Sequence, residues 1–146
     1  MIKYNLTVII ALTIIPIIGI FGTLGYAVNN GVVWQEPVLL IFFWIFTGLG
    51  ITAGYHRLFS HRSYKAHPIL EWFLTFAGAA ALQNSTLKWC SDHRRHHKQL
   101  DTDKDPYSIT KGFFHAHIGW IFENNPEPID KVKDLEEKTA IRFQHK

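Results

Sequence analysis

Two long stretches without charge, residues 6–28 and 38–55, most strongly limit the folds open to this chain. Between them and within them, the one charged side chain is Glu36. A helix rises about 1.5 Å per residue, so each stretch can cross a hydrocarbon layer about 30 Å thick. The first stretch also exceeds the apolar core of a signal peptide, which is usually about 7–15 residues long. We therefore predict an all-α integral membrane protein with a retained transmembrane helical hairpin, in a single domain over residues 1–146.

The rest of the chain, residues 56–146, is polar and contains every Lys and Arg except Lys3. The connector between the two spans, residues 29–37, contains neither residue type. The positive-inside rule therefore places both ends of the hairpin in the cytoplasm and the connector outside. A net charge of +3 and a pI near 9.0 fit a basic face beside anionic lipid. We expect a membrane-lipid partner and no nucleic-acid partner.

A third apolar segment, residues 69–87, is predicted to lie on the membrane or dip into it. Its uninterrupted apolar core, residues 72–82, is too short for an ordinary span. If the segment crossed the bilayer, the histidines before and after it would face opposite compartments and could not share a metal ion. The cytosolic part of the molecule is therefore expected to be a helical, metal-binding region.

Small residues gather near the end of the second span. Gly48, Gly50 and Gly54 are spaced so that another helix can approach the backbone closely. We predict that a neighbouring helix packs against these glycines.

Five histidines form two clusters after the spans: His56 and His61 in HRLFSH, and His93, His96 and His97 in HRRHH. Histidine clusters without cysteine pairs favour iron, copper, nickel or zinc over calcium or magnesium. On an α-helix the second cluster spans roughly 100° and forms one face, with Arg94 and Arg95 pointing toward solvent or anionic groups.

The first pair is spaced i, i+5 and diverges by about 140° on a regular helix. Those two imidazoles can reach one metal only if the helix ends or distorts between them; otherwise they serve different metals. Interfacial histidines with no metal are the alternative. We expect no ligand role for the remaining histidines, His67, His115, His117 and His145.

The number of imidazoles exceeds one tetrahedral site and suggests two metal ions. Iron is favoured for an inert hydrocarbon substrate, because iron–oxygen chemistry can attack an unactivated C–H bond. The lipid nature of the substrate is itself inferred from the spans.

The sequence around both clusters resembles the membrane fatty acyl-CoA desaturases of the stearoyl-CoA (delta-9) type. Residues 50–62, GITAGYHRLFSHR, resemble the first histidine box of that family, and residues 83–98 resemble the second box with its lead-in. Residues 105–108 (DPYS) and 112–120 (GFFHAHIGW) match the segment that follows. The amino-acid sequence of the boxes is closer to that of bacterial members.

The resemblance implies a non-haem diiron centre that inserts a cis double bond into a saturated fatty acyl chain. O2 is the co-substrate, and electrons come from an external donor: a ferredoxin, a rubredoxin, or a b-type cytochrome with its reductase. The implied iron ligands are His56, His61, His93, His96 and His97.

The resemblance also implies that Asn5, Asn84 and Asp92 contact the acyl-CoA. Read from the residues alone, Asn84 is equally suited to cap a helix end, and Asp92 could support a ligand histidine. The implied location is a multi-pass protein of the bacterial inner membrane rather than the endoplasmic reticulum, with its histidine boxes on the cytoplasmic side.

The chain departs from this family in length and in ligand number. Family members have four spans and a third histidine box, HNxHH, which is absent here. A basic pair that grips coenzyme A is replaced by Asn124 and Asn125, so coenzyme A, a carrier protein and a phospholipid all stay open as the acyl carrier.

We therefore predict the N-terminal fragment of a fatty acid desaturase, inactive on its own. A diiron membrane hydroxylase is one alternative. A non-catalytic metal-binding membrane protein is another, if the chain is naturally this short.

Overall fold

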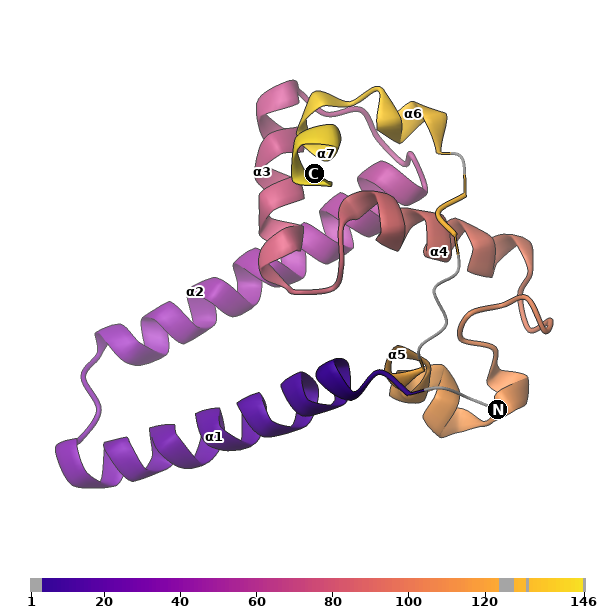
Figure 1. The fold of residues 1–146 in the computed structure, drawn as a ribbon. Coiled ribbons are helices and arrows are strands. Elements are labelled where there is room, and N and C mark those ends of the chain that lie inside the picture. The colour runs from indigo at the N-terminus through magenta and orange to yellow at the C-terminus, as the bar shows by residue number, and fades with distance from the viewer. Residues whose placement is uncertain (1–3, 124–127, 131, 146) are drawn as a thin grey trace.

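The computed structural model describes residues 4–123, 128–130 and 132–145, and this part of the chain is helical with no strand. The predicted all-α class is therefore confirmed. Two long apolar helices extend together to one side of the molecule, away from the shorter helices (Figure 1). They are α1 (Leu6–Asn30) and α2 (Gln35–Leu49), joined by a short connector.

Local signals set the ends of the first apolar helix. The side chain of Asn5 accepts a hydrogen bond from the Val8 N–H, which satisfies one of the unpaired donors of the first turn. Gly31 ends the helix with a φ of 76°, a left-handed conformation that glycine adopts at no steric cost.

The second apolar helix does not stop at Leu49 but continues as a π-helix, η1 (Gly50–Ser60). The continuous helix over Gln35–Ser60 and helix α1 are each long and apolar enough to cross a membrane. Neither α1 nor α2 contains a buried residue, so the apolar side chains of both helices face outward. Such exposure suits a lipid environment, because apolar side chains are unfavourable in water and favourable among lipid tails.

Helix α3 (Pro68–Ala80) packs closely against η1. A Cβ added to Gly50 would lie 2.2 Å from the backbone nitrogen of Gly78, and one on Gly54 would lie 3.0 Å from the Cβ of Leu74. A Cβ on Gly48 would meet nothing within 4 Å. The predicted close packing is thus confirmed for Gly50 and Gly54 but not for Gly48.

The apolar segment predicted over residues 69–87 is divided between two helices. Helix α3 ends at Ala80, and the chain then turns through Leu82 and Asn84, which have φ values of 56° and 81°. Helix α4 (Thr86–Lys98) follows, with the side chain of Ser85 accepting a hydrogen bond from the Lys88 N–H at its start. This reversal carries the second histidine cluster back toward the end of η1 (Figure 1).

The C-terminal segment completes the core with helices α6 (Lys133–Glu136) and α7 (Thr139–Gln144). Leu135 and Ile141 are fully buried together with Tyr55 and Phe59 of η1. The side chain of Gln144 accepts hydrogen bonds from the N–H and hydroxyl of Thr86, at 2.9 and 2.8 Å. Long-range contacts therefore hold the tail against both histidine-bearing helices.

The segment between α4 and the tail lies near the start of α1 (Figure 1). It contains η2 (Ile109–Lys111), η3 (His115–Gly119) and α5 (Trp120–Phe122). The Asn5 N–H donates to the Phe122 carbonyl at 2.8 Å, which ties this segment to the first apolar helix.

Candidate metal centre

The two histidines of the first cluster lie on the same side of η1 because this helix has π geometry. The His61 N–H donates to the His56 carbonyl at 3.0 Å, an i→i+5 hydrogen bond. In a π-helix, residues five apart lie nearly one turn apart, whereas on an α-helix they diverge. Their ring centroids are 4.5 Å apart. The expected distortion between the two histidines is therefore present.

Helix α4 contributes His93 and His97, which are one α-helical turn apart and face the end of η1. The ring nitrogens of four histidines come within 4.8 Å of one another. Three Nε2–Nε2 distances join them in a row: 3.1 Å from His56 to His61, 3.0 Å from His61 to His93, and 3.1 Å from His93 to His97. We call His56, His61, His93 and His97 the four-histidine cluster.

Hydrogen bonds between the imidazoles cannot account for all of these nitrogen–nitrogen contacts. Each Nε2 carries either one N–H or one lone pair, and the Nε2 atoms of His61 and His93 each face two other nitrogens. A cation at the centre would instead accept a lone pair from every ring. Metal–nitrogen bonds of about 2.0–2.1 Å place neighbouring ligand nitrogens roughly 3 Å apart, which matches the observed spacing. The donor set fits a transition-metal ion, iron included.

The environment keeps two of these rings, His61 and His93, neutral, as metal ligation requires. Burial, together with the neighbouring imidazoles, lowers the pKa of His93 to about 3. Burial and the nearby His56 also lower the pKa of His61. Near pH 7 both rings therefore offer a lone pair and carry no charge.

His96, the fifth expected ligand, lies outside the four-histidine cluster. Its Nδ1 lies 2.9 and 3.0 Å from the two carboxylate oxygens of Asp105. On α4 it is roughly 100° around the axis from His97, so a site between His93 and His97 leaves it to one side. A hydrogen bond at Nδ1 leaves Nε2 as the nitrogen for a metal, the usual arrangement of an oriented histidine ligand. A ligand role for His96 stays a prediction.

Asp105 is almost fully buried, and the polar groups around it favour its ionised form. Burial raises its pKa, but hydrogen bonds from His96 and from the N–H groups of Asp101 and Tyr107 outweigh burial and hold the pKa below its ordinary value. Sequence reasoning assigned it no role. The one feature that could have indicated Asp105 is its place in the DPYS motif after the second cluster. A buried acid in a polar loop is not part of any periodic pattern of apolar residues.

Tyr107 of the same motif contacts two histidines of α4, His93 and His96. Its hydroxyl lies 3.3 Å from the Nδ1 of His93, and its ring lies against that of His96 with centroids 4.3 Å apart. Tyr107 and Asp105 therefore fix the outer nitrogens of two histidines on α4. Such partners orient ligand rings and set their tautomers.

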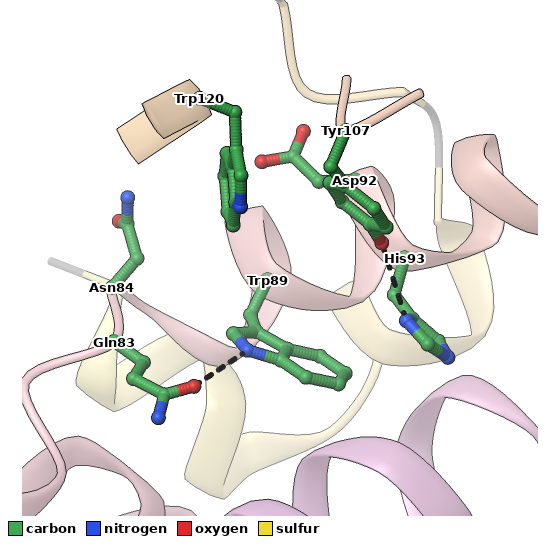
Figure 2. Close-up of a pocket in the computed structure, with 7 residues that line it drawn as sticks. All are labelled: Gln83, Asn84, Trp89, Asp92, His93, Tyr107 and Trp120. Carbon is green, nitrogen blue, oxygen red and sulfur yellow. Dashed lines mark hydrogen bonds between the residues drawn. The ribbon is translucent and has the colours of Figure 1, made fainter. Parts of the chain in front are cut away.

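A cavity of about 290 Å³ opens beside His93 (Figure 2). The Trp89 ring stacks on the His93 ring with centroids 4.8 Å apart. The Trp89 indole N–H donates to Gln83 at 3.2 Å, which fixes the stack. The cavity is lined by Gln83, Asn84, Trp89, Asp92, His93, Tyr107 and Trp120. Aromatic walls with a few polar groups are typical of a small-molecule site.

Two of the three residues expected to contact the substrate line this cavity, namely Asn84 and Asp92. Asn84 does not cap α4, since Ser85 holds that position, but it occupies the left-handed turn before the helix. Asp92 pairs with Lys88 at 2.7 Å, and burial raises its pKa. Asp92 does not support a ligand histidine in the way that Asp105 does. Asn5 is not among the lining residues and caps α1 instead.

Comparison with known proteins finds several desaturases. Over 135 residues the chain is 44% identical to a probable acyl-CoA desaturase of Schizosaccharomyces pombe, which covers 90% of this chain and 27% of that protein. It is 45% identical over 120 residues to stearoyl-CoA desaturase 5 of Bos taurus, covering 76% of this chain and 36% of the relative. An sn-1 stearoyl-lipid 9-desaturase of Anabaena variabilis is 42% identical over 112 residues, covering 75% and 41%.

Most of this chain is homologous to part of the fatty acid desaturases. The predicted resemblance to desaturases is thereby confirmed. No family model matches the chain. It spans between 27% and 42% of the length of the first desaturases that it matches. The fungal, bovine and Anabaena desaturases have nearly the same sequence identity to this chain, 44%, 45% and 42%. A closer likeness to bacterial desaturases therefore stays a prediction.

The four histidines outside both boxes lie apart from the four-histidine cluster. His67 accepts a hydrogen bond from the Ile69 N–H at the start of α3, and His145 contacts the Ser85 hydroxyl at 2.9 Å. His115 pairs with Glu123 at 3.1 Å, and the His117 ring stacks on Phe113. Asn124 and Asn125, which bear on the acyl carrier, lie outside the described residues.

Proposed function

We propose that this chain forms part of a membrane fatty acid desaturase that introduces a cis double bond into a saturated fatty acyl chain, with an acyl-CoA and the delta-9 position preferred. One observation carries the proposal: histidines from both boxes converge at the end of a long apolar helix. The desaturase relatives support it, since several are named delta-9 or stearoyl-CoA desaturases.

The proposed topology is a multi-pass protein of the bacterial inner membrane. Helices α1 and α2 would cross the bilayer, α3 would lie along it, and the four-histidine cluster would face the cytoplasm. The clustering of Lys and Arg after His56 and their absence from the connector support this orientation. Cysteine labelling in intact cells tests this orientation. The native thiol of Cys90 should react little with a maleimide, because it is fully buried and burial raises its pKa to about 12.

A membrane-impermeant maleimide should label Trp34→Cys in the connector and leave Lys65→Cys unlabelled until the cells are opened. The reverse pattern would contradict the orientation. Native Cys90 supplies the background in both variants.

The proposed cofactor is a pair of non-haem iron ions. The four-histidine cluster offers ligands around a common point, and His96, oriented by Asp105, is available to the second ion. Bound iron would supply the O2 chemistry that removes two hydrogens from adjacent unactivated CH2 groups, while electrons from an external donor reduce O2 to water. That donor would be a ferredoxin, a rubredoxin, or a b-type cytochrome with its reductase. We expect the other ligands to come from residues outside this chain.

The cavity beside His93 would take the carrier end of the acyl substrate. Asn84 and Asp92 would contact its polar groups, and the Trp89 and Tyr107 rings would line the entry of the alkyl chain. Each buried CH2 group would contribute about 0.8 kcal/mol to binding. The aromatic walls would also exclude water from the region between the substrate and His93.

The decisive experiment is expression of the reading frame that contains this chain in a host lacking its own desaturase, with gas chromatography of the cellular fatty acids. We expect new cis-unsaturated chains with the intact protein and none with His97→Ala. The control His117→Asn changes a histidine outside the cluster and should retain activity. This chain alone should yield no product.

Other products would redirect the assignment. A fatty alcohol or hydroxy acid in place of an alkene would make the protein a diiron hydroxylase. Unchanged fatty acids, from a well-expressed protein that contains iron, would support a non-catalytic metal-binding role.

A further inference from the structure

Arg94 lies between two histidines of α4, but its side chain reaches back to the end of η1. Its guanidinium donates to the Ser60 carbonyl at 3.1 Å and to the Phe59 carbonyl at 2.6 Å. The last carbonyls of a helix lack partners within that helix, so these two acceptors need an outside donor. Ser60 immediately precedes His61, so Arg94 holds the backbone from which that imidazole projects.

Asp134 of α6 holds the same guanidinium from the opposite side. Its carboxylate oxygens lie 2.9 and 2.8 Å from the two terminal nitrogens of Arg94, a bidentate pair. Arg62 also donates to Asp134, with its Nε at 3.0 Å. One carboxylate thus joins Arg62, which directly follows the first histidine cluster, to Arg94 within the second. The expected anionic contact of Arg94 is therefore an internal one.

We propose that Arg94 and Asp134 are positioning residues for the metal centre, because together they fix His61 relative to His93 and His97. This inference rests on the proposed metal-binding function of the four-histidine cluster. A planar guanidinium presents donors in a rigid fork, which allows Arg94 to serve two carbonyls and a carboxylate at once. A lysine at this position would keep the charge but could not reproduce that fork.

The chain contains a matched pair for comparison. Arg95, the next residue on α4, donates through its Nε to Asp130 at 3.1 Å and through a terminal nitrogen to the Pro128 carbonyl. This pair also joins α4 to the C-terminal segment, but its carbonyl partner is not in η1. Asp130→Asn therefore removes a carboxylate of the same kind without touching the backbone of His61.

The first experiment titrates the purified full chain, in detergent, with Co²⁺ as the probe and follows its absorbance. We expect Asp134→Asn and Arg94→Gln to weaken Co²⁺ binding by about tenfold, the lower end of the effect of removing a partner that orients a metal ligand. Arg94→Lys should bind as weakly as Arg94→Gln, and Asp130→Asn should match the wild type. Full recovery with lysine, or equal loss in Asp130→Asn, would overturn the proposal.

The second experiment is hydrogen–deuterium exchange of residues 56–64 in metal-free protein. We expect faster exchange in Asp134→Asn and Arg94→Gln than in the wild type, and unchanged exchange in Asp130→Asn. Unchanged exchange in all three variants would overturn the positioning role, whatever the metal result. If the wild type fails to bind Co²⁺ but exchange responds as expected, the metal centre is refuted while the coupling of Arg94 to the His61 backbone stands.

Discussion

The backbone N–H of His61 donates to the carbonyl of His56, and this single π-helical hydrogen bond brings two divergent imidazoles onto one side of the helix. The rings then lie 4.5 Å apart, within reach of His93 on another helix. The π-helix is held from outside by α3, which packs against it where Gly50 and Gly54 leave room. The metal-binding geometry of the first histidine box therefore depends on a helix that carries none of the ligands.

Substitution of Gly50 tests this dependence. An added methyl group would meet the backbone of Ala77 and Gly78 at 2.2–2.8 Å, where no flexible side chain can move aside. We expect Gly50→Ala to destabilise the fold by about 1–3 kcal/mol, measured by thermal unfolding in detergent. The matched variant Gly48→Ala has open space and should be neutral or stabilising by up to about 1 kcal/mol. Equal effects at both positions would contradict the close packing of α3 on η1.

Metal binding should stabilise the fold measurably. At free metal about a hundredfold above its dissociation constant, a native-state ligand adds about 2.7 kcal/mol to the free energy of unfolding. We expect Co²⁺ or Fe²⁺ to raise the melting temperature of the wild type, and a chelator to reverse the rise. His97→Ala should lose it. His67→Asn is the control, because asparagine keeps an acceptor at the start of α3. A shift that survives in His97→Ala would place the metal elsewhere.

Asp105 should matter far more than its neighbours in the same loop. It accepts hydrogen bonds from the N–H groups of Asp101 and Tyr107 and holds His96, all while nearly fully buried. Truncation to alanine leaves these donors without their acceptor, and we expect Asp105→Ala to cost about 1–3 kcal/mol in unfolding free energy. The exposed Asp103→Ala should change it by less than about 0.5 kcal/mol. Similar losses from both would argue against a specific role for the buried carboxylate.

Stability should fall in acid through Asp134. The hydrogen bond from Arg94, opposed by burial and assisted by Arg62, lowers the pKa of Asp134 to about 2. Because the folded state depresses this pKa, the contribution is complete above the unfolded pKa of about 3.9 and is lost as the pH falls through about 2. Asp134→Asn should therefore be less stable than the wild type near pH 7, and the difference should shrink between about pH 4 and 2. Parallel stability curves would contradict this role.

Part of the candidate site could be predicted from residue spacing. His93 and His97 are one helical turn apart in any α-helix, so their shared face follows from the sequence alone. The same angles also placed His96 on that face, at its edge. Its actual direction depends on Asp105, a residue from a loop that local periodicity does not describe.

The sequence by itself determined the two long apolar helices, the all-helical class and the types of ligand, because hydrophobic length and side-chain chemistry are local properties. Only the tertiary structure decided that His56 and His61 point the same way and that Arg94 reaches the η1 carbonyls and Asp134. The Arg94 contacts join residues tens of positions apart, and the π-helix that aligns His56 with His61 is packed against α3, a separate helix. No local pattern encodes such contacts, since chain folding alone brings the partners together.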